Sequence, residues 1–326
     1  MRAIIILCLI STSLFAQQAH DFEVIGEIDY SFKTENTYDS FDANDDYLVW
    51  FEYTRGILFT YDLRTDELEQ MKLARGRGPA EFQMISDLYI TKNDKIYLAD
   101  YPNAKLLVWD VKESEFEEDI VLNSPPFRIA GNDYEMFIQG MHMEQPLSKL
   151  NLETGEQQTL DIGDGFFNKV KGMERMFNRE GNLLLSSDGL LHLSKYQNAI
   201  TRFKVGEQQK KVEVRTTAFE EPQDLGLESV STANGGSNYR LNPQELMLAK
   251  DMAKREGSEE VYLVLEDNSG SLKYSNKSIY YFSDTLSSEK SPQLVTRLPF
   301  AIERLTANSD FFFAYSIEEN KVYILE

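Results

Sequence analysis

The sequence predicts an all-β fold in which six repeated sheets form a closed ring, a six-bladed β-propeller. Three observations lead to this prediction. A strand–turn–strand unit recurs six times, most of its copies start about 40–50 residues apart, and an unmatched strand near the N-terminus fits a gap in the last copy. The 20 Phe and 17 Tyr residues also suit strands, because flat and bulky side chains pack well on a pleated surface.

The second strand of each unit is the easiest to recognise, because an apolar run follows a turn of Asn, Asp or Gly. The predicted second strands are 44–53, 93–101, 132–140, 180–188, 258–267 and 308–316. The predicted third strands are 56–68, 104–116, 146–157, 198–208, 277–289 and 320–326. Several of these segments alternate polar and apolar residues, as half-buried antiparallel strands do.

The last unit stops after its third strand and lacks an outer strand. The segment 22–28, FEVIGEI, precedes the first complete unit and has no partner of its own. We therefore expect this segment to complete the sixth blade and close the ring. Closure removes an exposed sheet edge, which would otherwise promote aggregation.

A long interval before the fifth unit carries the signals of a helix. Asn242 can cap it, Pro243 suits its first position, and Glu245 fits a capping box. Spaced apolar residues supply one face and Gly257 a stop. We predict a helix over 243–256, inserted in or before the fifth blade. It would act as a lid over one mouth of the channel, or as a packed decoration that covers a gap between blades.

The N-terminal residues resemble an export signal. Arg2 precedes the apolar run 3–10, and small and polar residues follow. The run is too short for a membrane span, and cleavage after Ala16 is expected. The prediction is therefore a signal peptide over 1–16 and a single domain over 17–326, exported to the periplasm or the cell surface.

Cys8 is the single cysteine and would leave with the signal, so the mature chain is predicted to have no disulfide and no thiol nucleophile. It follows Leu7 inside the apolar run, so a lipid anchor is not expected. A net charge of −21 repels nucleic-acid backbones and anionic lipid surfaces. No later segment is apolar enough for a transmembrane span.

A family resemblance rests on GRGPAEF at 76–82 and on the following segment 85–110, ISDLYITKNDKIYLADYPNAKLLVWD. These residues resemble the blade signature of exported bacterial six-bladed propellers of the NHL-repeat and TolB-like group. Ala80 stands where that signature has a last glycine, and Lys105 stands where it usually has arginine. The resemblance implies the fold and the export, and it says less about activity.

There are four interpretations of the loop LARGRGPAEF, 73–82. It lacks the Lys and the hydroxyl of a phosphate-binding loop, and Pro79 removes a backbone donor. It precedes a strand rather than a helix, unlike a dinucleotide fingerprint. A junction between blades explains its glycines and proline best, and contact of Arg77 with a ligand is the alternative.

Further arginines fall at the predicted innermost strands, which line the channel. Arginines around a channel can clamp a carboxylate, a sulfate or a sugar acid bidentately. The alternative is that they form ion pairs with acidic neighbours and stiffen the ring. The candidate ligand ring is Arg77, Arg128, Arg175 and Arg304, and the candidate acidic partners are Asp87, Glu174 and Glu303.

No metal site is predicted. The acidic cluster 42–46 lacks the glycine and the distant Glu of a calcium loop, so it is interpreted as a turn, and so is 161–166. No carboxylate is spaced to join a pair of histidines around a metal, so structural roles are favoured for His20, His142 and His192. No serine nucleophile elbow is present.

The leading functional hypothesis is an exported binding scaffold that presents its channel mouth to a small anionic molecule, a glycan or a partner protein. An enzyme of the propeller lactonase or lyase type, which would use calcium in the channel, is the less favoured alternative. A structural partner in a cell-envelope assembly is a third. No other cofactor and no catalytic residue is predicted.

Overall fold

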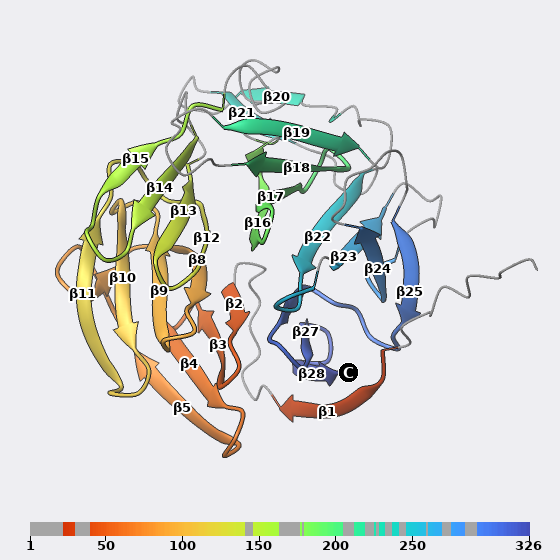
Figure 1. The fold of residues 1–326 in the computed structure, drawn as a ribbon, viewed down its shortest axis with the longest axis horizontal. Helices are drawn as coiled ribbons and strands as arrows, with labels where there is room; N and C mark the ends of the chain where they lie inside the picture. The colour runs from red at the N-terminus through yellow and green to blue at the C-terminus, as the bar shows by residue number, and fades with distance from the viewer. Residues whose placement is uncertain are drawn as a thin grey trace, which may run out of the picture.

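A computed structural model describes residues 22–29, 40–140, 146–162, 177, 179–204, 212–218, 225, 228–231, 237–240, 246–258, 260–268, 275–283 and 292–326. Within these residues six four-stranded antiparallel sheets stand around a central axis, so the predicted six-bladed propeller is confirmed (Figure 1). No helix of the described residues is long and apolar enough to cross a membrane.

Five blades run outward in chain order. Blade 1 is β2 (Ser40–Ala43), β3 (Tyr47–Glu52), β4 (Ile57–Asp62) and β5 (Glu67–Lys72). Blade 2 is β8 (Ile85–Ile90), β9 (Lys95–Asp100), β10 (Lys105–Asp110) and β11 (Glu115–Val121). Blade 3 is β12 (Arg128–Gly131), β13 (Glu135–Gln139), β14 (Leu147–Asn151) and β15 (Gln157–Thr159). Blade 4 is β16 (Gly181–Ser186), β17 (Gly189–Ser194), β18 (Ala199–Lys204) and β19 (Glu213–Ala218). Blade 5 is β22 (Met247–Ala253), β23 (Glu260–Asp267), β24 (Ser278–Ser283) and β25 (Gln293–Arg297).

Blade 6 joins the two ends of the described chain. It contains β26 (Arg304–Ala307), β27 (Phe312–Ser316) and β28 (Lys321–Leu325), and its outer strand is β1 (Val24–Asp29). β1 pairs with β28 in antiparallel register, with Ile28 opposite Val322. The predicted closure of the ring by the segment 22–28 is therefore confirmed.

The core lies between the blades, where neighbouring sheets pack face to face. Between blades 1 and 2, Phe51 and Leu58 pack against Ile85 and Leu98 in one buried cluster. Between blades 6 and 1, a second cluster contains Phe313 and Trp50. Because the second strands are buried on both faces, they appear in the sequence as nearly continuous apolar runs.

The predicted helix over 243–256 is wrong in its described part, because Met247–Ala253 form β22, the innermost strand of blade 5. The pairing of β22 with β23 changes register between Ala249 and Asp251, which marks a β-bulge. This bulge brings Ala249 and Met252, three residues apart, into one apolar cluster. A three-residue spacing of this kind imitates the apolar face of a helix, which explains the error.

In blade 4 the predicted second strand is also displaced. The segment 180–188 contains β16, which is the innermost strand, and the second strand is β17. Both segments are apolar, and a bend of two residues, 187–188, separates them. The repeat pattern therefore fitted either strand equally well.

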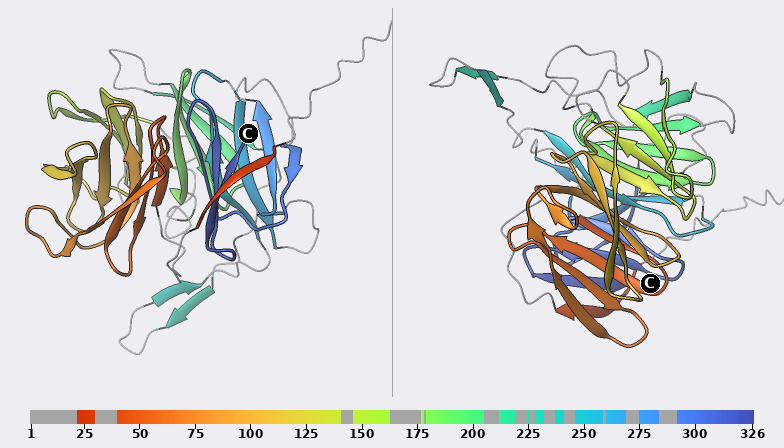
Figure 2. Two further views of the ribbon diagram at one scale, coloured as in Figure 1. Left: turned by 90° about the horizontal axis from the view of Figure 1, so that it is seen from below. Right: turned by 90° about the vertical axis from the view of Figure 1, so that its left-hand side faces the viewer.

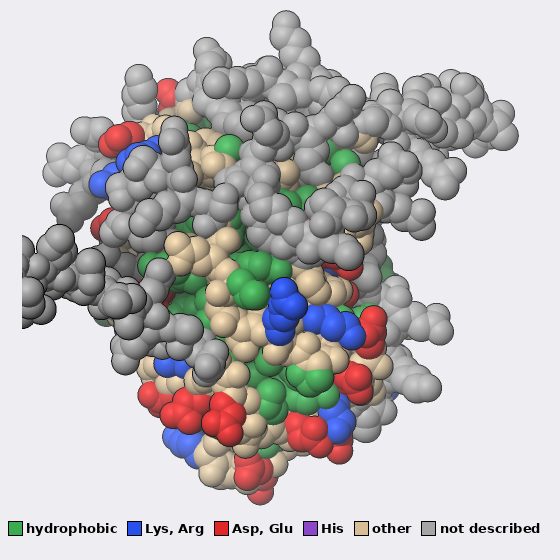
Figure 3. Space-filling model, turned by 90° about the vertical axis from the view of Figure 1, so that its right-hand side faces the viewer, with side chains coloured by type: hydrophobic (Ala, Val, Ile, Leu, Met, Phe, Trp, Pro, Cys, Tyr) green, Lys and Arg blue, Asp and Glu red, His purple; other side chains and the backbone are tan. Residues whose placement is uncertain are grey.

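Two small sheets lie outside the blades. β6 (Ala74–Arg75) and β7 (Glu81–Phe82) pair in parallel at the junction of blades 1 and 2. β20 (Glu228–Ser231) and β21 (Ser237–Arg240) form a hairpin that projects from the ring in both views of Figure 2. Figure 3 shows that acidic, basic and apolar side chains lie beside one another on the face at the right-hand side of Figure 1.

Candidate functional site

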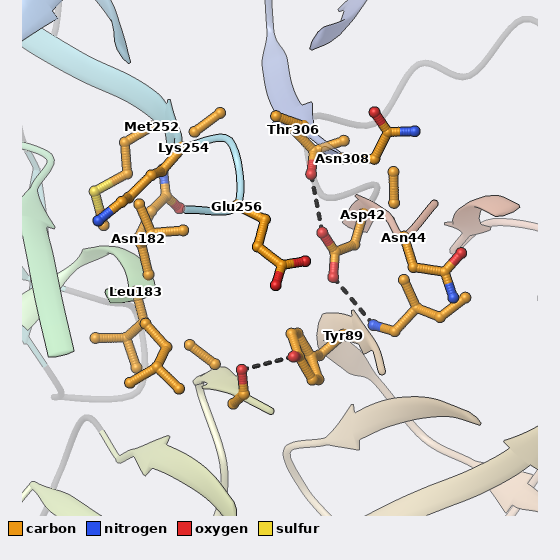
Figure 4. A pocket seen from close by; sticks show the side chains of 18 of the residues that line it. Asp42, Asn44, Tyr89, Asn182, Leu183, Met252, Lys254, Glu256, Thr306 and Asn308 are labelled. Carbon is orange, nitrogen blue, oxygen red and sulfur yellow. Dashed lines mark hydrogen bonds between the residues drawn. The ribbon is translucent and has the colours of Figure 1, made fainter. Parts of the chain in front are cut away.

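The channel at the centre of the ring contains a cavity of about 590 Å³. Residues of the innermost strand of every blade line it, and the turns that follow these strands form one mouth. A cavity of this volume is in the range that takes small molecules. Figure 4 shows several of the polar side chains on its wall, among them Asp42, Tyr89 and Glu256.

A polar side chain links each innermost strand to the innermost strand of the next blade. Every one of these six links is a hydrogen bond, and five of them involve the backbone of the neighbouring strand. Asp42 Oδ2 accepts from Ile90 N (3.0 Å), Asp87 Oδ2 from Ile129 N (2.9 Å) and Asp251 Oδ2 from Leu305 N (2.9 Å). Arg128 Nε donates to Gly181 O (2.8 Å), Asn182 Nδ2 to Lys250 O (2.8 Å) and Thr306 Oγ1 to Asp42 Oδ1 (2.9 Å). We call these six contacts the inner hydrogen-bond ring.

The three carboxyls of the inner ring are buried in the channel wall, and burial favours their neutral form. Burial raises the pKa of Asp42 to about 7 and the pKa of Asp251 to about 6, against an ordinary value of 3.8. Burial also raises the pKa of Asp87, while the charge of nearby Arg128 opposes that rise. At neutral pH the channel wall therefore carries less negative charge than its three carboxyls suggest.

Two of the predicted arginines, Arg128 and Arg304, line the channel. Arg128 directs its guanidinium at backbone carbonyls, with Nη1 donating to Ser86 O at 2.6 Å in addition to the inner-ring bond. The aromatic ring of Phe127 lies against this guanidinium, with the ring centroid 4.5 Å from Arg128 Cζ. The charge of Arg304 lowers the pKa of Asp251, against the larger effect of burial. Arg128 therefore stabilises contacts between blades.

Arg77 is exposed and does not line the channel cavity, and Arg175 lies outside the described residues. Of the expected acidic partners, Asp87 lies beside Arg128, whereas Glu303 pairs with Lys250 (3.1 Å). Glu174 lies outside the described residues. Of the three predicted arginines that the structure describes, Arg128 and Arg304 line the channel and Arg77 does not.

The carboxylate of Glu81 fills the loop that carries Arg77. Glu81 Oε2 accepts from Gly78 N at 2.8 Å, and a Cβ atom added at Gly76 would lie 2.0 Å from the same oxygen. Asn103 Nδ2 and Lys105 Nζ hold the loop from blade 2 by donating to Gly76 O and Gly78 O. The carboxylate occupies the place where a phosphate would bind, so the interpretation as a blade junction describes this loop best.

The turns at the channel mouth are ordered by asparagine side chains. Asn44 Oδ1 accepts from Tyr47 N at 2.7 Å, so residues 44–46 form a turn as expected, while Asp42 belongs to β2. The Oδ1 atoms of Asn132 and Asn308 likewise accept hydrogen bonds from backbone N–H groups of their own turns. Their Nδ2 donors make no hydrogen bond within the described part of the chain.

One ion pair crosses the mouth. Lys92 lies in the turn after β8 and Glu256 in the turn after β22, on blades that stand opposite each other in the ring (Figure 1). Lys92 Nζ donates to Glu256 Oε1, and this contact raises the pKa of Lys92. In Figure 4 the side chain of Glu256 extends into the cavity, so the turn after β22 narrows the channel.

Within the described ranges, no group of three or more His, Cys, Asp or Glu side chains is arranged to hold a metal ion. His192 is fully buried on β17, and its Nε2 lies 3.2 Å from Arg179 O. Burial lowers the pKa of His192 to about 3, so it stays neutral. His20, His142 and most of the turn 161–166 lie outside the described residues.

The sequence matches a family model described as 6-bladed beta-propeller, DUF5128, over residues 31–224. The chain belongs to this family. The match covers more than half of the chain and includes all the strands of blades 1 to 4. No curated protein matches it in sequence.

Solved structures share the fold at low sequence identity. A virginiamycin B lyase from Staphylococcus aureus aligns with a TM-score of 0.56 at 11% identity, over 94% of this chain and 99% of that one. A duf4221 family member from Bacteroides vulgatus gives 0.53 at 10%, over 95% and 99%. A chain of a mitotic checkpoint complex gives 0.58 at 8%, over 93% of each. At such identities the likeness concerns the fold alone.

Proposed function

We propose that this propeller is an exported, non-catalytic binding protein that holds a small polyhydroxylated ligand, such as a sugar of a glycan, in its channel mouth. The observation that carries the proposal is the channel cavity of about 590 Å³ with a preformed polar wall. The inner hydrogen-bond ring fixes that wall, so binding requires little reorganisation.

The chemistry of the mouth favours hydroxyl groups over an anion. Arg128 already donates to carbonyls of two blades, and six carboxyl side chains line the channel. Asn132 and Asn308 instead offer neutral amide donors on opposite sides of the mouth, and Glu256 in the same lining offers an acceptor. Sugar hydroxyls both donate and accept, so they match a wall that offers both kinds of group.

Asparagine-to-aspartate substitutions test the site sharply, because Asp keeps the Oδ1 acceptor that forms the turn and removes the Nδ2 donor. Saccharide binding is found on a glycan array and measured by calorimetry. We expect Asn132→Asp or Asn308→Asp to weaken the strongest saccharide about tenfold. The matched control is Asn151→Asp, in a similar turn of blade 3 remote from the channel. No saccharide bound, or equal binding by all three variants, would contradict the proposal.

Export rests on the N-terminal segment 1–16. Its charged start and short apolar run support secretion, and the family match is silent on location. Fractionation of expressing cells and N-terminal sequencing test it. The expected mature protein begins at Gln17 outside the cytoplasm, and an intact N-terminus in the cytosol would refute the proposal.

A calcium-dependent lactonase or lyase finds less support. Asp42, Asp87 and Asp251 each accept a backbone hydrogen bond from the next blade, and the described residues contain no cluster suited to a metal. The lyase among the solved structures shares 11% identity, so its chemistry does not carry over to this chain.

A partner protein on the opposite face is a second candidate, favoured by one exposed cluster. Arg75 lies over the ring of Tyr53, with Arg75 Cζ 4.6 Å from the ring centroid. Arg77 and Met84, later in the same segment, are also exposed. Arginine, tyrosine and methionine are enriched in protein interfaces. An envelope pull-down tests it: Arg77→Glu should lose the partner that the parent protein captures, and its retention would contradict this candidate.

A further inference from the structure

A second cavity, of about 560 Å³, lies outside the channel on the other side of the turn after β22. Residues of blades 5 and 6 line it, together with Phe22, which precedes β1. We define the side pocket by Phe22, Arg255, Glu260, Tyr262, Phe312 and Glu326. Five residues line both this pocket and the channel cavity, namely Arg255, Glu256, Gly257, Ser258 and Ser309.

Three aromatic rings form the apolar wall of the side pocket. Phe22 packs edge-on against Tyr262 and Phe312, with ring centroids 5.3 Å and 4.9 Å apart. Tyr262 and Phe312 meet at 4.8 Å in the same manner. All three rings are largely buried, so this wall is rigid.

Arg255 is the cation of the side pocket and lies against its aromatic wall. Its Cζ atom is 4.8 Å from the centroid of the Phe312 ring. Its Nε is buried and makes no hydrogen bond, and the described residues give its guanidinium no ion pair. A buried guanidinium donor without an acceptor is costly, and such groups ordinarily meet an anion or a bound molecule.

The acidic neighbours of Arg255 restrict which anion fits. Glu260 Oε2 accepts from Tyr262 at 2.7 Å, and Glu326 lines the same cavity. A ligand with only negative charge would meet repulsion from both glutamates. A ligand that also carries an ammonium group would place it beside them.

We propose that the side pocket binds a zwitterionic ligand, an α-amino acid or short peptide with a hydrophobic side chain. The two Nη groups of Arg255 bind its carboxylate end-on, the ammonium group faces Glu260 and Glu326, and the side chain contacts the aromatic wall. Bidentate binding of a carboxylate suits the planar guanidinium. Arg255 also lines the channel cavity, but the binding groups proposed here, Arg255, Glu260 and Glu326, differ from Asn132 and Asn308 of the proposed saccharide site.

Calorimetry on the mature chain tests the proposal with L-phenylalanine and the dipeptide Phe-Phe as probes. We expect saturable binding of at least one probe. Its C-terminal amide and its N-acetyl form should each bind about tenfold more weakly, because each removes one charged contact. Absence of binding by both probes, or equal binding of the amide and the acid, would overturn the proposal.

Two variants assign the binding to Arg255. Arg255→Gln removes the charge, and Arg255→Lys keeps the charge without the fork of donors. We expect both to weaken the probe about tenfold, with Arg64→Gln, on an exposed turn of blade 1, as the unaffected control. Unfolding midpoints confirm that each variant is folded. Probe affinity that is unchanged in folded Arg255→Gln would refute the assignment, whatever saccharides do in the channel.

Discussion

Lys92 of blade 2 and Glu256 of blade 5 form an ion pair across the mouth of the channel. Both side chains are more than half exposed, so solvent weakens their attraction. The pair nevertheless joins opposite blades and holds the turn 254–258 over the cavity. Its importance therefore lies in access to the channel more than in stability.

Breaking this pair should loosen the turn without unfolding the protein. For Lys92→Gln we expect a loss in unfolding free energy below about 1 kcal/mol. Hydrogen exchange of the amides in 254–258 should become faster, as it should in the parent protein at high salt. Arg64→Gln removes another exposed cation and serves as the control. Unchanged exchange in Lys92→Gln would show that the pair does not hold the turn.

The buried carboxyl of Asp42 should make stability depend on pH. Burial raises its pKa from 3.8 to about 7, so between these values the native state holds a proton that the unfolded chain has released. Its contribution is present below about pH 4 and is lost as the pH rises through 7. Asp251, whose pKa burial raises to about 6, acts in the same sense.

The variant Asp42→Asn is neutral at every pH and keeps an oxygen that can accept from Ile90 N. Relative to the parent protein, we expect it to be more stable at about pH 8 than at about pH 5. Urea unfolding at both values measures the difference. Asp310→Asn, an exposed carboxyl on the turn before β27, should leave the difference near zero. A parallel pH dependence of Asp42→Asn and parent would refute the raised pKa.

The inner hydrogen-bond ring should contribute to stability one link at a time. Asn182→Ala removes the donor to Lys250 O and leaves a carbonyl of blade 5 without its partner. We expect a loss of about 1–3 kcal/mol in unfolding free energy. Asn123→Ala changes an exposed asparagine and should cost little. Equal stability of both variants would mean that Asn182 does not join the blades.

Closure of the ring gives a test with a control on the same strand. Ile28 is 7% exposed and packs between blades 6 and 1, whereas Ile25 is 47% exposed. Ile28→Asp buries a charge without a partner and should cost about 3 kcal/mol or more. Ile25→Asp should cost far less. Thermal unfolding compares them, and similar midpoints would argue against closure through β1.

The repeat pattern predicted the fold because the second strand of every blade is apolar and buried on both faces. The innermost strands were harder to predict, since they combine buried and channel-facing residues. In blade 5 the bulge between Ala249 and Asp251 gave β22 the apolar spacing of a helix. The segment 180–188 was predicted as a second strand although it contains the innermost strand, β16. The pattern could not separate the two, because β16 and the following β17 are both apolar.

The candidate site was predicted only in part. Placing Arg128 and Arg304 at innermost strands identified residues that do line the channel. The contacts of Arg128 were not predictable, because its acceptors are backbone carbonyls, which every residue type carries. A signal that went unused is a polar residue recurring within the innermost strands, at Asp42, Asp87 and Asp251. Arg255 was not predicted as a site residue, because the sequence pattern predicted a helix over 243–256.

The pairing of β1 with β28 also bears on how the protein is made. Lys321 and Glu27, which form an ion pair in that blade, are 294 residues apart in the sequence. Bringing such distant strands together carries a large loop-closure entropy, and contacts of this range form slowly. During synthesis the sixth blade lacks β28 until residues 321–325 have left the ribosome. The ring therefore cannot close before that point, and removal of β28 would leave it open.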